Sequence, residues 1–243
     1  MLNNGGNHMR NIKLILLGIL FVVLLTYPTQ ALETNSIMQR MENGFPNQVV
    51  VYEQVYNYET PYLSVSATIP QVTMFANNEW EKDFNKQLVD NFNRFLAEVD
   101  EVAKKNSDYA GKRNEFTYEL LVNYDVKLNR GGLLSLTIRS YYYTGGAHGM
   151  TVVDYVNVDL ITGHHIHFSD LFESEQDLQY VSQVINERVT EEPETYLIDE
   201  FTSDLLDADQ DFYLHEDGVM VCFGLYELAP YVAGIQEFAI PTP

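Results

Sequence analysis

The sequence predicts an α+β protein made of two small units, each a mainly antiparallel sheet with a helix packed on one face. Strand-like segments, in which apolar and polar residues alternate, occur in both halves of the chain. Each half also has a segment whose apolar residues recur at steps of three and four, as on one face of a helix. Because a sheet buries one face most readily against such a helix, the pattern predicts two α+β units.

The N-terminal 31 residues have the layout of a secretory signal. Arg10 and Lys13 precede the apolar run 14–25, and residues 29–31 offer small side chains where signal peptidase cuts. The apolar run is too short for a membrane-spanning helix, which needs about 20 residues. We therefore expect a signal peptide, 1–31, cleaved after Ala31, and a secreted protein on the cell-wall side. The alternative is an uncleaved N-terminal membrane anchor.

The first unit is expected at residues 48–143, after a flexible lead at 32–47 that is polar and contains Gly44 and Pro46. Its long helical segment covers residues 79–105, and its apolar stripe consists of Trp80, Phe84, Leu88, Phe92, Phe95, Val99 and Val102. Its predicted strands cover residues 49–58, 62–69, 116–128 and 133–143.

The second unit is expected at residues 144–243. Its helical segment, 174–190, has Leu178, Val181, Ile185 and Val189 on one side, and a further helix is predicted at 194–206. Its predicted strands cover residues 151–160, 164–168, 212–214 and 219–225, the last two forming a hairpin.

The candidate site is the glycine-rich loop that joins the strands 133–143 and 151–160. It contains Thr144, Gly145, Gly146, His148 and Gly149. Three glycines within five residues can adopt positive φ without a Cβ clash, so the loop can turn tightly. The pattern predicts a hairpin whose loop residues are structural, and it assigns no catalytic residue.

The charge of the chain narrows the classes of partner. With 35 acidic and 14 basic residues the net charge is −21, and loss of Arg10 and Lys13 with the signal takes it to −23. Nucleic acid and anionic membranes would be repelled, so membrane contact is expected only if the signal stays uncleaved. A cationic protein is favoured. The alternative is that the charge serves solubility and keeps the protein from adhering to an anionic cell wall.

Four histidines, His148, His164, His165 and His167, could in principle gather around Zn²⁺ or Cu²⁺. Their spacing matches no zinc-hydrolase signature, so we expect surface or hairpin-packing histidines, with no metal and no cofactor. Asp207, Asp209 and Asp211 alternate as in an EF-hand loop. That loop needs glycine at its sixth position and glutamate at its twelfth, where this chain has Phe212 and Gly218. We therefore expect a solvated acidic helix end here, with a loose Ca²⁺ site as the alternative.

No sequence motif indicates an enzyme. The chain contains no nucleophile elbow, Walker loop, dinucleotide fingerprint or Cys-x-x-Cys pair. Its single cysteine, Cys222, lies in an apolar strand-like run, which favours a small core residue over a catalytic thiol.

Several stretches together resemble a family of paired extracytoplasmic domains from Gram-positive bacteria. These are residues 142–149, 157–163, 168–172, 212–214, 217–218, 226–234 and 240–241. The C-terminal half resembles the outer domain of RsiV, a lysozyme-sensing anti-sigma protein, and a similar pair precedes the catalytic domain of the peptidoglycan deacetylase PdaC. The resemblance implies two small α+β units and carries no catalytic role to the His148 loop.

The same resemblance guides the expected function. From the residues before and after the apolar run we expect neither a sigma-binding part nor a deacetylase domain with its metal motifs. We therefore expect a cell-envelope binding module that recognises lysozyme or a cell-wall component. The alternative is an envelope hydrolase or deacetylase that uses the glycine-rich His148 loop.

Overall fold

The computed structural model describes residues 34–47, 49–73, 78–110 and 117–241. The predicted signal peptide and its cleavage site lie outside these residues. Among the helices that are described, none is long and apolar enough to cross a bilayer.

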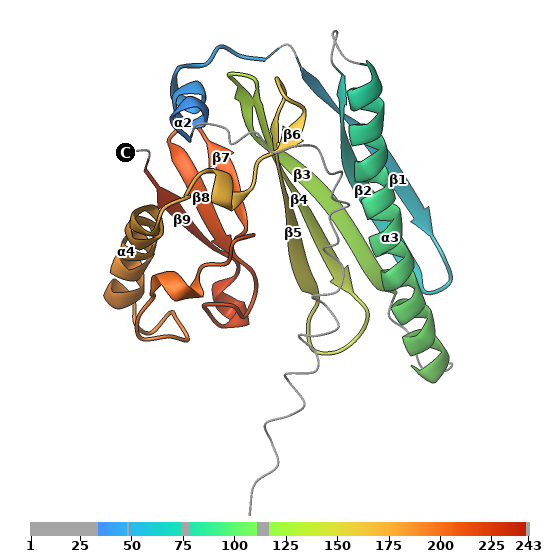
Figure 1. The fold of residues 1–243 in the computed structure, drawn as a ribbon. Coiled ribbons are helices and arrows are strands. Elements are labelled where there is room, and N and C mark those ends of the chain that lie inside the picture. Colours follow the sequence, from blue (N-terminus) through green and yellow to red (C-terminus); the bar gives the residue numbers. More distant parts are fainter. Residues whose placement is uncertain (1–33, 48, 74–77, 111–116, 242–243) are drawn as a thin grey trace, which may run out of the picture. The chain divides into compact units, whose positions relative to one another are not determined.

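A six-stranded sheet, in the order β1-β2-β3-β4-β5-β6, forms the centre of the fold (Figure 1). Its strands are β1 (Val50–Glu59), β2 (Leu63–Thr73), β3 (Tyr118–Arg130), β4 (Leu133–Tyr143), β5 (Met150–Asp159) and β6 (His164–His165). All neighbours are antiparallel except β2 and β3. These two parallel strands are joined by the long helix α3 (Asn78–Ala110), because a parallel pair needs a crossover connection.

Helix α3 covers one face of this sheet, as the apolar stripe predicts. Phe84, Leu88, Phe92 and Val99 are buried against β2, β3 and β4 in one hydrophobic core. On the helix, Asn85 also holds the sheet, since its side chain bonds both the N–H and the carbonyl oxygen of Val72 at 2.8 Å. The stripe therefore fixes which side of the helix faces the sheet.

A smaller antiparallel sheet packs with helix α4 (Glu175–Glu191) around a second core. Its strands are β7 (Phe212–His215), β8 (Gly218–Phe223) and β9 (Gln236–Ile240). Ser174 caps the start of α4: its side chain accepts a hydrogen bond from the Asp177 N–H, while the Asp177 carboxylate accepts one from the Ser174 N–H. This capping box satisfies two N–H groups at the helix start. The α+β class is thus confirmed.

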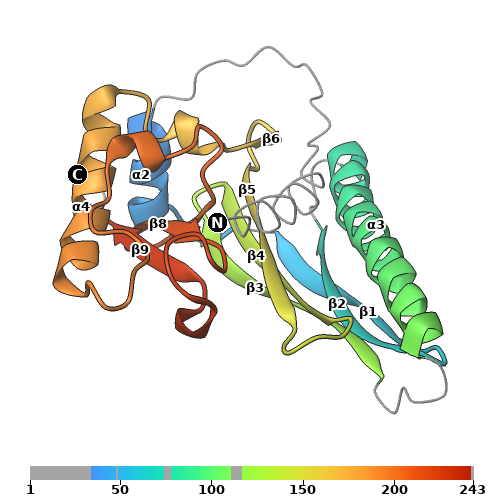
Figure 2. The same cartoon turned by 90° about the horizontal axis from the view of Figure 1, so that it is seen from below.

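The smaller sheet lies on the side of the six-stranded sheet opposite α3 (Figure 2), and a buried polar network connects the two sheets. The Ser135 hydroxyl donates to the Asn157 side chain at 2.6 Å, and it accepts the N–H of Leu214 at 3.0 Å. The amide of Asn157 donates to the carbonyl oxygen of Phe212 at 2.8 Å. Because buried polar groups are costly when unpaired, this network fixes where β7 meets β4 and β5.

The expected flexible lead contains instead helix α2 (Thr34–Asn43), a correction that the sequence pattern did not indicate. Ile37 and Met41 on this helix are fully buried in the second core. The segment is mostly polar, and its apolar face is too short to be recognised as a periodic stripe in the sequence. Packing against the rest of the protein stabilises this helix, as it does most short helices.

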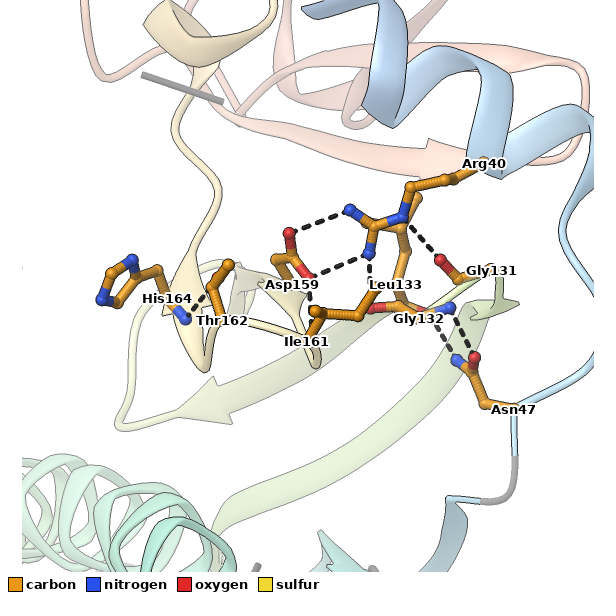
Figure 3. A network of polar contacts seen from close by, with 9 residues as sticks. All are labelled: Arg40, Asn47, Gly131, Gly132, Leu133, Asp159, Ile161, Thr162 and His164. Atoms are coloured by element: carbon orange, nitrogen blue, oxygen red, sulfur yellow. Dashed lines mark hydrogen bonds and ion pairs between the residues drawn. The ribbon is translucent and has the colours of Figure 1, made fainter. Parts of the chain in front are cut away.

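An ion pair fastens α2 to the six-stranded sheet (Figure 3). The guanidinium of Arg40 donates to both carboxylate oxygens of Asp159 at 2.9 Å, and also to the carbonyl oxygens of Gly131 and Gly132 at 2.7 and 3.1 Å. The Asp159 side chain is fully buried. Although burial opposes its ionisation, the bonds from Arg40 and the Ile161 N–H hold the pKa of Asp159 below its ordinary value. We call this group of contacts the Arg40 clasp.

Other local predictions differ from the structure. The helix predicted at 194–206 is only a single 3₁₀ turn, η3 (Ser203–Leu205). The strand predicted at 164–168 ends after His165, and the C-terminal tail adds β9 to the predicted hairpin. The expected division after residue 143 falls between β4 and β5, which pair with each other from end to end. The six-stranded sheet thus takes strands from both expected units.

Candidate binding surface at the glycine-rich loop

The glycine-rich loop, residues 144–149, is the tip of the hairpin between β4 and β5. Gly145 and Gly146 have φ of 103° and 99°, a conformation that strongly favours glycine. The tip is held by the Tyr143 hydroxyl, which donates to the Gly146 carbonyl oxygen at 3.1 Å, and by the Asn106 amide of α3, which donates to the Thr144 carbonyl oxygen at 2.5 Å. The loop is therefore supported on the side that faces α3.

Gly149 has a different role, which depends on space. Its φ is not in the positive region, but a Cβ at this position would lie 2.4 Å from the ring of Tyr141. Only glycine lets the backbone pass this close to the aromatic ring. That these loop residues have structural roles stays a prediction.

A second loop, residues 224–234, faces the glycine-rich loop. It contains Tyr226, which at φ 68° is the one non-glycine residue with positive φ in the described part of the chain. The turn around it is closed by the Glu227 carboxylate, which accepts the N–H of Gly224 at 2.6 Å. A bulky residue in this conformation stores backbone strain of about 1–3 kcal/mol. Such strain persists where neighbouring contacts over-determine the conformation.

The two loops meet through His148. Its ring stacks on Tyr231 with centroids 3.9 Å apart and an interplanar angle of 26°. The Tyr231 hydroxyl donates to the Gly149 carbonyl oxygen at 2.9 Å, and His148 Nδ1 lies 2.9 Å from the same oxygen. A carbonyl oxygen can only accept, so Nδ1 carries the proton. Nε2, at 3.4 Å from the Tyr226 hydroxyl, is then the acceptor.

Together the two loops form one exposed patch, which we call the loop surface and define as His148, Tyr226, Tyr231 and Val232. His148 is exposed, Tyr226 is 42% exposed and Val232 is 92% exposed, while Tyr231 is half-buried between its neighbours. Aromatic rings backed by packed neighbours are typical anchors of protein interfaces, because they combine a large apolar area with a polar tip. The patch thus has the chemistry of a binding surface.

Carboxylates lie beside this patch. Glu227 is exposed and follows Tyr226 directly. Desolvation, and then the negative charges of Glu227 and Asp154, raise the pKa of Asp211 to about 7. Because the outer side of Asp211 remains exposed, solvent screening moderates this shift. After desolvation, the repulsion from Glu227 and Asp154 contributes to the raised pKa of Asp211, and an approaching cation would relieve that repulsion.

Sequence reasoning found one half of the loop surface and missed the other. His148 belongs to the predicted loop, but its partners Tyr226 and Tyr231 were not predicted to lie near it. Both are in the stretch 226–234 that carries the family resemblance, so the signal was present as a motif. The contact between the two stretches spans more than 75 residues of sequence and depends on the packing of the two sheets.

The other histidines lie apart from His148. His164 and His165 form β6, which pairs with the far end of β5, a strand roughly 30 Å long at about 3.3 Å per residue. His167 Nδ1 is 3.9 Å from an Asp209 carboxylate oxygen. Within the described ranges, no group of three or more His, Cys, Asp or Glu residues is arranged to hold a metal ion.

Cys222 lies in the core, as predicted. It is fully buried on β8, and burial raises the pKa of its thiol to about 12. A thiol in this state is a poor nucleophile at neutral pH. Two shallow surface hollows, one bordered by Glu101 and Lys105 on α3 and one by Lys127 and Arg130 on β3, include no residue of the glycine-rich loop.

Comparisons with known proteins agree with the geometry. The family model described as deacetylase PdaC matches residues 56–151, and the model described as a protein of unknown function, DUF3298, matches residues 169–242. The two matches together support a pair of domains in which a PdaC-like domain is followed by a DUF3298-like domain. The His148 loop ends the first match, whereas Tyr226 and Tyr231 lie in the second. The loop surface is therefore built from both domains.

Individual relatives point the same way. The anti-sigma-V factor RsiV of Bacillus subtilis (strain 168) is 27% identical over 188 residues, which cover 74% of this chain and 63% of that protein. A DUF3298-family structure from Bacteroides fragilis has a TM-score of 0.59 at 19% identity, covering 82% of this chain and 92% of its own. A second DUF3298-family structure, from Pseudomonas aeruginosa, has a TM-score of 0.53 at 16% identity, covering 83% of this chain and 92% of its own. These structures share the fold, and the relatives support an envelope-associated domain.

Proposed function

We propose that this protein is a secreted cell-envelope binding module that recognises a cationic protein, with lysozyme as the first candidate, through the loop surface. The observation that carries the proposal is the meeting of His148 with Tyr226 and Tyr231. Two stretches that define the family resemblance thereby become one exposed aromatic patch. Contact between family motifs at an exposed surface favours a shared role in binding, because such a contact adds little to the core.

The chemistry of the patch suits a basic partner. Tyr226 and Tyr231 can accept the guanidinium or ammonium group of an approaching side chain over their rings, an interaction of about 0.5–2 kcal/mol. Glu227 adds a carboxylate at the same edge. The net charge of the chain, −21, attracts basic proteins at longer range, although salt screens this attraction beyond about 8 Å. Specificity must therefore come from the loop surface itself.

Lysozyme is proposed because the C-terminal half resembles the domain of a lysozyme-sensing protein. A cell-wall component is the other partner that the resemblance suggests. The match to the PdaC model also keeps an envelope hydrolase or deacetylase as the alternative. In the described structure Nδ1 of His148 contacts the Gly149 carbonyl oxygen and Nε2 contacts the Tyr226 hydroxyl. Because both ring nitrogens already have partners, an enzymatic role would require this loop to rearrange around a substrate.

Calorimetric titration with lysozyme at low and at physiological salt tests the proposal. We expect binding that persists at physiological salt and weakens at least about tenfold in Tyr226→Ala and Tyr231→Ala, since anchor residues each contribute more than about 1–2 kcal/mol. Tyr180→Ala is the matched control, because Tyr180 is 39% exposed on α4, close to the 42% of Tyr226. Binding that disappears at physiological salt, or that falls equally in the control, would refute the assignment.

Export is part of the same proposal. We expect the extracellular protein to begin at Leu32, as determined by mass spectrometry of intact chain from the culture medium. Recovery of the uncleaved chain only from membranes would instead support the N-terminal anchor.

A further inference from the structure

Strand β1 forms the outer edge of the six-stranded sheet (Figure 1). It is ten residues long and is exposed along most of its length. Natural edge strands are usually protected by lysine, proline, a bulge or a short length. β1 contains no lysine or proline and pairs with β2 without a register shift, and its exposed apolar residues are Val50, Tyr52, Val55 and Tyr58. The edge is thus open to another strand.

The hydrogen bonds at the β1–β2 turn show which backbone groups point outward. The Thr60 N–H donates to the Leu63 carbonyl oxygen at 2.8 Å, so Thr60 faces β2. In an antiparallel ladder alternate residues face the partner, and the even-numbered residues of β1 therefore face β2. The odd-numbered residues present both N–H and C=O to the free edge. They are Val51, Glu53, Val55, Asn57 and Glu59.

Two features of β2 agree with this assignment. Val72, opposite Val51, uses its N–H and its carbonyl oxygen to bond Asn85 of α3, and so does not bond β1. Pro70, opposite Glu53, has no N–H to donate. The pairs Val51–Val72 and Glu53–Pro70 are therefore non-hydrogen-bonded pairs, as expected if the odd-numbered residues of β1 point their backbone groups away from β2. In the described part of the chain, the five odd-numbered residues of β1 have no hydrogen-bond partner at this edge.

We propose that β1 is a self-association edge, at which it pairs antiparallel with β1 of a second copy of this chain about a two-fold axis through Val55. In that register the residue numbers of each pair add to 110, so Val55 meets Val55, Glu53 meets Asn57 and Val51 meets Glu59 of the other copy. Every pair joins two odd-numbered residues. All ten outward groups of each strand thereby find a partner.

The side chains favour this register over its neighbours. Tyr52 lies opposite Tyr58 of the other copy, an aromatic pair of the kind that stabilises antiparallel strands by about 0.2–1 kcal/mol. Shifting the axis by one residue toward Asn57 would place Glu53 opposite Glu59 twice, and like charges directly opposite are destabilising. Shifting the axis by one residue toward the start of β1 would leave Glu59 without an opposite residue in β1 of the other copy. A self-complementary edge of this kind fits a C₂ dimer.

The charge of the chain gives the dimer a distinctive salt dependence. Two copies that each carry −21 repel one another at long range, and salt screens that repulsion. Dimerisation should therefore strengthen as salt rises, whereas binding of a cationic protein weakens. This opposite dependence separates the dimer edge from the loop surface.

Sedimentation velocity of the protein in its processed form, as the cell produces it, tests the proposal. We expect a monomer–dimer equilibrium that shifts toward dimer as salt is raised. Val55→Glu and Val55→Lys should each abolish the dimer by placing like charges on the axis, and an equimolar mixture of the two should restore it as a heterodimer. Val102→Glu, at a position 45% exposed on α3, is the control and should leave the dimer intact.

Cysteine cross-linking checks the register. Opposed residues in a hydrogen-bonded pair are about 5.5 Å apart at Cα, within disulfide range. Val55→Cys should form a dimer under oxidation, whereas Tyr52→Cys should not, because its two copies lie about six residues apart along the strands. The native Cys222 is fully buried and should not contribute. A wild-type chain that is monomeric at every salt concentration, or a dimer insensitive to both Val55 substitutions, would overturn the proposal.

Discussion

The two ends of β4 carry glycine turns with opposite properties. At its start, the turn before Leu133 is enclosed, and Arg40 bonds both of its glycine carbonyls. A Cβ on Gly131 would lie 2.2 Å from the Arg40 carbonyl oxygen. At its end, the glycine-rich loop is exposed, and a Cβ on Gly146 would meet nothing within 4 Å. Both turns use positive φ, but only the first has other parts of the chain packed closely against its glycines.

This difference separates stability from binding within one hairpin system. The enclosed turn, together with the Arg40 clasp, fixes helix α2 and the end of β5. The exposed loop keeps its backbone supported by Asn106 and Tyr143 while leaving the His148 face open. Substitutions at the first end should therefore affect folding, and substitutions at the second should affect binding.

The largest effect is expected for Arg40→Ala. This substitution leaves the Asp159 carboxylate buried without its cation, and breaking such a pair costs about 3–5 kcal/mol. The free energy of unfolding, measured by urea titration, should fall by that amount. Lys86→Ala is the control, because Lys86 and Asp90 form an exposed pair on α3 whose loss should cost less than about 1 kcal/mol. Equal effects would mean that the clasp does not stabilise the fold.

Gly131→Ala compared with Gly146→Ala should sharpen the contrast. Both glycines have positive φ, which costs an L-residue about 1–2 kcal/mol. Gly131→Ala adds a backbone clash with Arg40, so its total destabilisation should reach about 2–5 kcal/mol when overpacking of about 1–3 kcal/mol is included. Denaturant unfolding of both variants measures the difference. Similar values would contradict the assignment of Gly131 to an enclosed turn.

Tyr226→Gly should separate folding stability from partner binding at one residue. Glycine relieves the strain of φ 68°, so the variant should be more stable by up to about 1 kcal/mol or unchanged, once the greater freedom of glycine in the unfolded chain is counted. The same change removes the exposed ring and should weaken partner binding at least about tenfold. Thermal unfolding and calorimetry on the same preparation provide both measurements. A variant that binds normally would exclude Tyr226 from the interface.

The smallest effect concerns pH. The folded-state pKa of Asp159 lies below its unfolded value, so the clasp contributes its full stability above the unfolded value of about 3.9 and loses it as pH falls through the folded value. The contribution of Asp159 to the unfolding free energy should therefore stay constant between pH 7 and 5 and decline below about pH 4. In Asp159→Asn this part of the decline should be absent. An unchanged acid profile in that variant would show that other carboxylates control acid unfolding.

Local sequence patterns predicted elements whose residues act over short distances. The helices α3 and α4 both follow from their regular apolar stripes. The pattern failed for α2, where only a few apolar residues lie within ten, and for residues 194–206, where three apolar residues at helical spacing did not form an α-helix. Short segments lack enough local energy to decide their own conformation, so tertiary packing decides it.

The sequence by itself determined the acidic charge, the α+β class and the glycine-rich turn, because composition and periodicity are properties of neighbouring residues. Only the tertiary structure decided that Arg40 pairs with Asp159 and that His148 lies against Tyr231, since these contacts join residues 119 and 83 positions apart. It likewise decided which strand stands at the edge of the sheet. Such contacts depend on how the sheets and helices pack as a whole, and no local pattern encodes that arrangement.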